Sequence, residues 1–75
     1  MYAKYEDSAI MDHRRRFAAK LKRICEAQGW TVERLAREAG MSGNAVRDLI
    51  DVRHTPSRRT ILALLALESR LEGER

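Results

Sequence analysis

A chain of 75 residues has room for one domain and lies near the lower size limit at which an apolar core sustains a fold without staples. Its one cysteine, Cys25, excludes an internal disulfide and a cysteine-rich zinc site. The 15 Lys and Arg against 11 Asp and Glu give a formal charge of +4, which suits a domain that binds a polyanion and equally a merely well-solvated surface. No apolar run is long enough for a signal peptide or a membrane span, so we expect a cytoplasmic protein without a membrane partner.

Residues 1–11 mix both signs of charge and show no apolar period, which predicts a flexible N-terminal arm. Asp12 is placed to cap a first long helix over residues 13–28, which is followed by Gly29. The apolar stripe of this helix consists of Phe17, Leu21, Ile24, Cys25 and Gln28. After the glycine, Trp30 is expected to pack inward and Thr31 to cap the next helix.

Residues 32–51 contain two short amphipathic helices separated by a tight corner. Leu35, Ala36 and Ala39 share one face of the first helix. Gly40 follows them, and a glycine there can take the left-handed conformation that ends a helix, because it has no Cβ to clash.

The second of these helices begins at Ser42, whose hydroxyl can accept a backbone N–H from the first turn. Its apolar face is formed by Val46, Leu49 and Ile50. Two short helices joined by a glycine-containing turn are typical of the helix-turn-helix unit, whose second helix enters the DNA major groove in DNA-binding versions.

A loop over residues 52–56 ends at Pro56, and Ser57 can cap a last helix over residues 58–72. A kink into a fifth short helix near Glu68 is the alternative to one continuous helix.

This last helix is apolar on nearly all sides, so one stripe can face the core while the remainder would be exposed in a monomer. We expect Leu62, Leu67 and Leu71 to form a homodimer interface.

Residues 21–67 resemble the Cro/C1-type (xenobiotic-response-element, XRE) helix-turn-helix family of bacterial and phage transcriptional regulators. The matching residues, in register and without a gap, are Leu21, Gly29, Thr31, Leu35, Ala36, Ala39, Gly40, Met41, Ser42, Val46, Leu49, Pro56, Ser57, Thr60, Leu62 and Leu64. Ala36, Gly40 and Val46 occupy the three most diagnostic positions of the motif. The resemblance implies an all-α fold, a compact four- to five-helix bundle of the lambda-repressor-like DNA-binding type with a central helix-turn-helix. That domain would occupy residues 12–75, after the arm.

The resemblance also implies which residues contact DNA. The base-contacting positions would be Ser42, Gly43, Asn44, Arg47 and Asp48. Asn44 would pair with an adenine edge and Arg47 with guanine or a phosphate, while Asp48 would accept from cytosine or hold Arg47 in place. Phosphate contacts would come from Arg53, His54, Arg58 and Arg59.

Three residues depart from the family pattern. Val32 stands where the family favours a Gln that touches phosphate and braces the recognition helix. Gly43 replaces a position that is often a base-reading Gln or Arg. Val52 stands where a glycine normally lets the loop turn, and a β-branched residue there makes a left-handed backbone costly.

These features imply a sequence-specific, repressor-like transcriptional regulator that binds double-stranded DNA as a homodimer. The alternative is a protein-interaction module, or the antitoxin of a toxin–antitoxin pair, that keeps the scaffold with weak base readout and binds a toxin or an anti-repressor. An enzyme is not expected, because His13, His54 and Cys25 form no catalytic constellation, and we expect neither a cofactor nor a metal.

Overall fold

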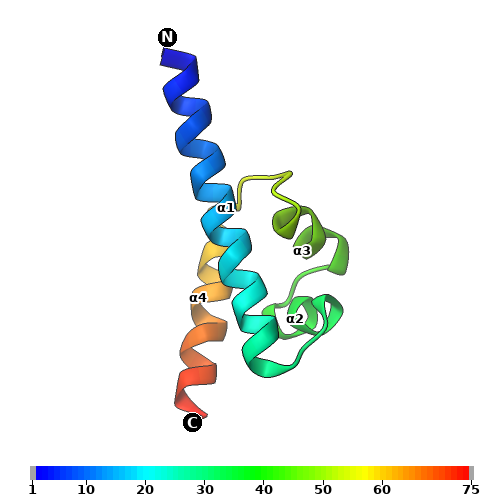
Figure 1. The fold of residues 1–75 in the computed structure, drawn as a ribbon. Helices are drawn as coiled ribbons and strands as arrows, with labels where there is room; N and C mark the ends of the chain where they lie inside the picture. The colour runs from blue at the N-terminus through cyan, green and yellow to red at the C-terminus, as the bar shows by residue number, and fades with distance from the viewer. Residues whose placement is uncertain (1, 75) are drawn as a thin grey trace.

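The computed structural model describes the backbone of residues 2–74 and the side chains of residues 8–74. Its elements are α1 (Tyr2–Gln28), α2 (Val32–Ala39), α3 (Gly43–Ile50) and α4 (Arg58–Gly73). Figure 1 shows α1 and α4 on one side of the molecule and α2 and α3 on the other. The expected all-α bundle is confirmed, with four helices and no strand in the described part of the chain, and α4 continues through Glu68 as one helix. None of these four helices is both long enough and apolar enough to cross a membrane.

Three helices begin at the capping residues that the sequence predicts. The hydroxyls of Thr31, Ser42 and Ser57 each accept a backbone N–H from three residues further on, at 3.1–3.2 Å. Gly29 and Gly40 follow α1 and α2 with φ angles of 68° and 71°, in the left-handed region that residues with a Cβ avoid. The helix ends around the corner are therefore set by local chemistry that is visible in the sequence.

All four helices contribute to one hydrophobic core, which is aliphatic except for Phe17. Leu35, Val46 and Leu64 are its largest fully buried side chains. The other members of the cluster are Phe17, Leu21, Ala36, Leu49 and Leu67. Trp30 is partly buried against this cluster, as expected, and the Arg34 guanidinium lies 5.3 Å from the centre of its ring.

The first helix is longer than the sequence predicts. We expected a helix start near residue 13 after an arm over residues 1–11, but α1 begins at Tyr2, and its N-terminal turns project beyond the rest of the molecule (Figure 1). Asp12 is not an N-cap: it lies inside α1, and its carboxylate pairs with Arg16 one turn later at 2.8 Å. The physical reason is that no Pro or Gly interrupts residues 1–28, so the backbone hydrogen bonds continue upstream of the apolar stripe.

The exposed leucines of α4 also differ from the prediction. Leu67 was expected in a dimer interface, but it is 3% exposed and belongs to the core, and Leu71 is partly buried against that core. Leu62 is 55% exposed, as expected, and Leu65, which was not predicted, is 48% exposed. A helix that is apolar on nearly all sides does not reveal from its period which stripe turns inward.

Candidate nucleic-acid interface

The corner between α2 and α3 is held by backbone geometry and by close packing. The left-handed Gly40 lets the amide of Met41 donate to the carbonyl of Ala36 at 2.7 Å, which closes the end of α2. Ala36 and Val46 are at most 1% exposed, so the two helices meet on small and branched side chains with almost no solvent between them. Because Val46 and Leu49 turn the apolar side of α3 into the core, the opposite side of α3 faces solvent.

The predicted base-contacting residues lie along this solvent-facing side and at its start. Ser42, Asn44 and Arg47 are exposed, while Gly43 and Asp48 are half-buried. Ser42 also caps α3, with its hydroxyl 3.1 Å from the amide nitrogen of Ala45. The side chains available to reach away from the molecule are thus concentrated in the first two turns of α3.

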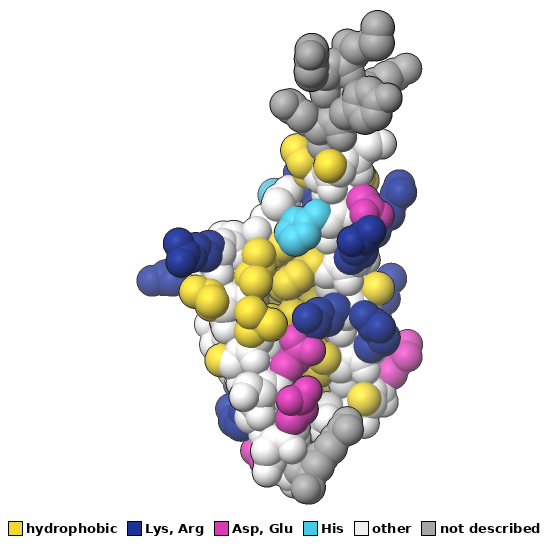
Figure 2. All heavy atoms as spheres, turned by 90° about the vertical axis from the view of Figure 1, so that its left-hand side faces the viewer, with side chains coloured by type: hydrophobic (Ala, Val, Ile, Leu, Met, Phe, Trp, Pro, Cys, Tyr) yellow, Lys and Arg dark blue, Asp and Glu magenta, His cyan; other side chains and the backbone are white. Residues whose placement is uncertain are grey.

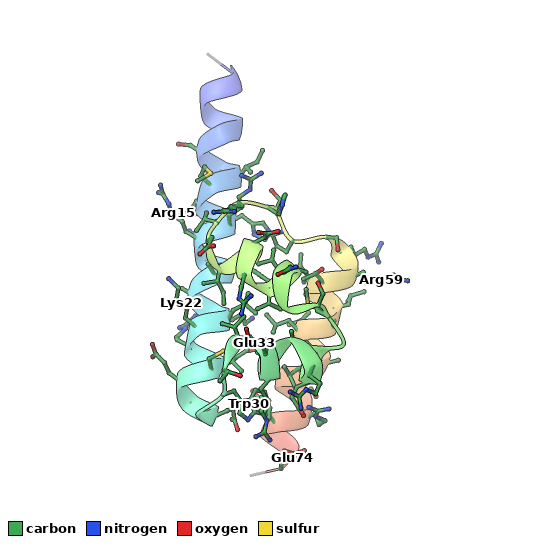
Figure 3. The ribbon with its side chains drawn as sticks, turned by 90° about the vertical axis from the view of Figure 1, so that its right-hand side faces the viewer. Arg15, Lys22, Trp30, Glu33, Arg59 and Glu74 are labelled. Carbon is green, nitrogen blue, oxygen red and sulfur yellow. The ribbon has the colours of Figure 1, made fainter. Side chains whose placement is uncertain are left out.

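Arg47 forms an ion pair that sequence reasoning missed. Its guanidinium Nη2 pairs with Oε1 of Glu33, in the first turn of α2, whereas the sequence offered Asp48 as its partner. Both side chains remain about half exposed, at 56% and 52%, so the pair lies at the surface. A Cβ built on Gly43 would lie 3.9 Å from Cγ of Glu33, so the glutamate side chain lies beside the start of α3. Figure 3 shows Glu33 near the middle of the face formed by α2 and α3.

Asp48 faces the loop after α3. Its Oδ2 lies 3.6 Å from Nε2 of His54, and its Oδ1 lies 4.0 Å from Nη1 of Arg53. The loop is tied to α1 by a hydrogen bond that Nε of Arg14 donates to Oγ1 of Thr55 at 2.8 Å. The structure therefore brings Asp48 together with the two loop residues that were predicted to contact phosphate.

The same loop contains a strained residue. Val52 has a φ of 63°, which makes it the one positive-φ residue other than glycine in the described chain. This is the position where the sequence has a β-branched residue in place of a turn glycine, and the backbone takes the costly left-handed conformation although the residue is valine. The turn is closed by the amide of Arg53, which donates to the carbonyl of Asp48 at 2.9 Å.

Further basic side chains lie at both edges of this face. Arg58 and Arg59 are exposed at the start of α4, and no acidic side chain among residues 8–74 forms an ion pair with either of them. Figure 3 shows Arg59 at one edge of the view and Arg15 and Lys22, both exposed residues of α1, at the other. The exposed side of α3 is therefore flanked by positive charge from two other helices.

Comparison with known protein families shows which family the chain belongs to. Residues 16–72, well over half of the chain, match the family model of a helix-turn-helix domain. The chain belongs to this helix-turn-helix domain family. The domain occurs in Cro/C1-like regulators, which agrees with the resemblance carried by the residues of the corner. No significant match was found among curated proteins or among solved structures.

Outside the helix-turn-helix unit, the described residues that could support catalysis or metal binding lie apart from one another. Burial raises the pKa of the Cys25 thiol, and the nearby Glu26 carboxylate raises it further, so this thiol stays protonated and is a weak nucleophile at neutral pH. Among the described residues, no three His, Cys, Asp or Glu side chains gather to hold a metal ion. The candidate functional site is therefore the solvent-facing side of α3 together with the basic side chains that flank it.

Proposed function

We propose that this helix-turn-helix domain is a sequence-specific transcriptional regulator, repressor-like, that binds double-stranded DNA as a homodimer with α3 in the major groove. The observation that carries this proposal is the solvent-facing side of α3. It is held rigidly against α2 by the Ala36 and Val46 contact and is flanked by basic side chains of α1, of the loop and of α4. A rigid helix with exposed polar side chains and basic flanks has the shape and charge that a major groove requires.

Within α3, three side chains have chemistry that distinguishes bases. The Asn44 amide can bond both edge atoms of adenine, and the Arg47 guanidinium can bond O6 and N7 of guanine while one of its nitrogens stays on Glu33. Asp48 can accept from the amino group of cytosine. Gly43 and Ser42, at the start of the helix, let the backbone approach the groove closely.

Affinity would come from phosphate contacts that carry no sequence information. Arg58 and Arg59 lie at the positive end of α4, while Arg53 and His54 lie beside Asp48 at the end of α3. A two-fold related pair of domains would place two recognition helices in successive major grooves about 34 Å apart, which predicts a pseudo-palindromic site.

The test is a selection of bound sequences from random duplexes, followed by the same selection with Arg47→Ala. The variant should lose preference at one position of each half-site, by roughly 5- to 150-fold in relative affinity. Arg70→Ala is the matched control. Arg70 also pairs with a glutamate of α2, Glu38, but it lies in the last turn of α4, away from α3 and from the arginines at the start of α4. A preference that both variants change alike would exclude α3 as the reading helix.

A second candidate function is a protein-interaction module that keeps the scaffold, such as an antitoxin that binds a toxin, or a regulator held by an anti-repressor. The carboxylates of Glu33 and Asp48 favour it, because Glu33 already pairs with Arg47 of α3, and Asp48 lies near the basic groups of the loop that follows α3. It predicts that no duplex from the selection binds better than random DNA at physiological salt. In either case we propose that the protein acts in the cytoplasm.

A further inference from the structure

Glu33 links α2 to α3 through a single ion pair. Three ion pairs join different helices among residues 8–74, and two of them do not involve α3. One of these two joins α1 to α4, and Figure 2, which looks onto those two helices, shows acidic side chains beside Lys and Arg. The other joins α2 to α4 through Glu38 and Arg70. The pair of Glu33 with Arg47 is therefore the one that reaches the exposed side of α3.

Both members of this pair stand on backbone that the core holds in place. Glu33 lies in the first turn of α2, where the next two core residues, Leu35 and Ala36, are at most 1% exposed. Arg47 follows Val46, which is fully buried. The side chains of the pair are themselves about half exposed, so they extend from two fixed helices toward solvent. Only side-chain torsions remain free, and the ion pair restrains those of Arg47.

Gly43 leaves room for the Glu33 side chain beside α3. Gly43 and Arg47 lie four residues apart on α3, so they share one side of that helix. A Cβ built on Gly43 would lie 3.9 Å from Cγ of Glu33, and Oε1 of the same glutamate pairs with Nη2 of Arg47. The glutamate therefore extends past the Cα of Gly43 to reach Arg47. A long side chain at position 43 would compete for this space.

The chemistry of the guanidinium lets Arg47 keep this pair while it binds a base. The group has five N–H donors in one plane, so a bond from Nη2 to Glu33 leaves enough donors for O6 and N7 of guanine. These guanine acceptors belong to a neutral base edge. A DNA phosphate carries a full negative charge, so it would compete with the carboxylate for the guanidinium and be repelled by it at close range. The pair thus disfavours a phosphate contact more than a guanine contact.

We propose that Glu33 is a positioning residue for base recognition: it orients Arg47 toward a guanine edge and lowers the affinity of Arg47 for phosphates. Without the carboxylate, the arginine would move freely and would bind phosphates of any sequence. With the carboxylate, the contribution of Arg47 to binding depends on the base that lies opposite it. This inference rests on the proposed function and assigns a role in it to a residue outside α3.

The experiment compares two duplexes that differ at one base pair. One is the duplex from the selection, and the other is changed at the position whose preference Arg47→Ala loses. We call the ratio of their affinities, measured by fluorescence anisotropy, the guanine ratio. In Glu33→Gln the guanine ratio should fall roughly three- to fivefold while the affinity for random duplexes rises roughly threefold. Partial unfolding would lower both quantities, and the loss of one negative charge alone would raise all affinities and leave the guanine ratio unchanged.

Two controls separate the ion pair from net charge and from the rest of the site. Glu38→Gln removes the same charge from α2 and should keep the guanine ratio within about 1.5-fold of wild type. In an Arg47→Ala background, Glu33→Gln should also leave the guanine ratio unchanged, because the side chain that contacts the base is gone. Circular dichroism verifies that each variant is folded.

A guanine ratio in Glu33→Gln equal to that of wild type would overturn this inference and leave the proposed function standing. An Arg47→Ala variant that loses no base preference would also overturn it, because Glu33 would then have no base contact to position. A wild-type protein that binds no selected duplex more tightly than random DNA would refute the proposed function and this inference together.

Discussion

Val52 is the residue at which local backbone strain is most visible in the described chain. Its φ of 63° lies in the left-handed region, where a side chain with a Cβ costs about 1–2 kcal/mol. Val52 is half-buried, so packing of its side chain stabilises the loop while its left-handed backbone destabilises it. Gly40, with a φ of 71°, has the same backbone conformation without that cost.

A comparison of Val52→Gly with Val52→Ala separates these two contributions. Both substitutions remove the valine side chain, but only glycine relieves the left-handed strain, so Val52→Gly should be more stable than Val52→Ala by about 1 kcal/mol. Urea unfolding of the two variants measures this difference. Equal free energies of unfolding would mean that the loop leaves the left-handed region when the valine is removed.

Glu33 is the residue whose role is least apparent from the sequence. It pairs with Arg47 across the corner, and its charge lies beside the start of α3, where a DNA phosphate or base edge would arrive. Glu33→Gln keeps the shape of the side chain and removes the charge. We expect it to raise the affinity for random duplexes by roughly threefold in a fluorescence anisotropy titration, since Arg47 gains a free charge and a repulsion is lost.

Glu38→Gln is the control for this prediction, because Glu38 is also a glutamate of α2 paired with an arginine, Arg70. It removes the same formal charge at the far end of α2. If both variants raise the affinity equally, net charge alone explains the gain and the pair of Glu33 with Arg47 has no special effect.

The leucines of α4 differ in burial, so we expect their substitutions to differ in the cost to stability. Leu67 is 3% exposed and belongs to the core, whereas Leu62 is 55% exposed on the outer side of α4. Leu67→Ala should cost about 2–5 kcal/mol of unfolding free energy, because it opens a cavity in the hydrophobic core. Leu62→Ala should cost less than about 1 kcal/mol in the monomer, since that side chain leaves no cavity.

Urea denaturation at a concentration below the dimer dissociation constant measures both costs without a contribution from association. Similar costs for the two variants would contradict the orientation of α4 about its own axis.

The helix ends around the corner were predictable, whereas the start of α1 and the rotation of α4 were not. Thr31, Ser42 and Gly40 act through hydrogen bonds and backbone angles within a few residues, so their roles are visible in the sequence. The start of α1 lacks such a signal, because helix-forming residues continue upstream of the apolar stripe. The rotation of α4 depends on which side α2 and the rest of the core approach, and a helix apolar on nearly all sides does not encode that direction.

At the scale of the whole molecule, the family and the fold could be predicted from three scaffold positions of the corner, while the electrostatics of the site could not. Ala36, Gly40 and Val46 have steric roles that admit few other residues. The pairing of Arg47 with Glu33 joins residues on two helices, and only their packing shows that these charges meet. Fewer basic side chains are therefore free to meet DNA than the 15 Lys and Arg of the chain suggest.

This distribution of charge predicts that individual arginines contribute unequally to the salt dependence of DNA binding. Arg59 has no acidic partner among the described side chains, so Arg59→Ala should reduce the slope of log affinity against log salt by about one unit. Arg70→Ala, at the opposite end of α4, should leave the slope unchanged. Titrations of one duplex at several salt concentrations measure both slopes, and equal slopes for the two variants would remove the start of α4 from the proposed DNA contact surface.

The most direct measurement of sequence-specific recognition by α3 is the ratio of two affinities of the wild-type protein. A duplex taken from the selection and a scrambled duplex of the same composition are titrated at one physiological salt concentration. The proposed function predicts that the selected duplex binds at least about 1,000-fold more tightly and that its sequence is pseudo-palindromic. A ratio near one would contradict sequence-specific recognition, whatever the affinity for DNA in general.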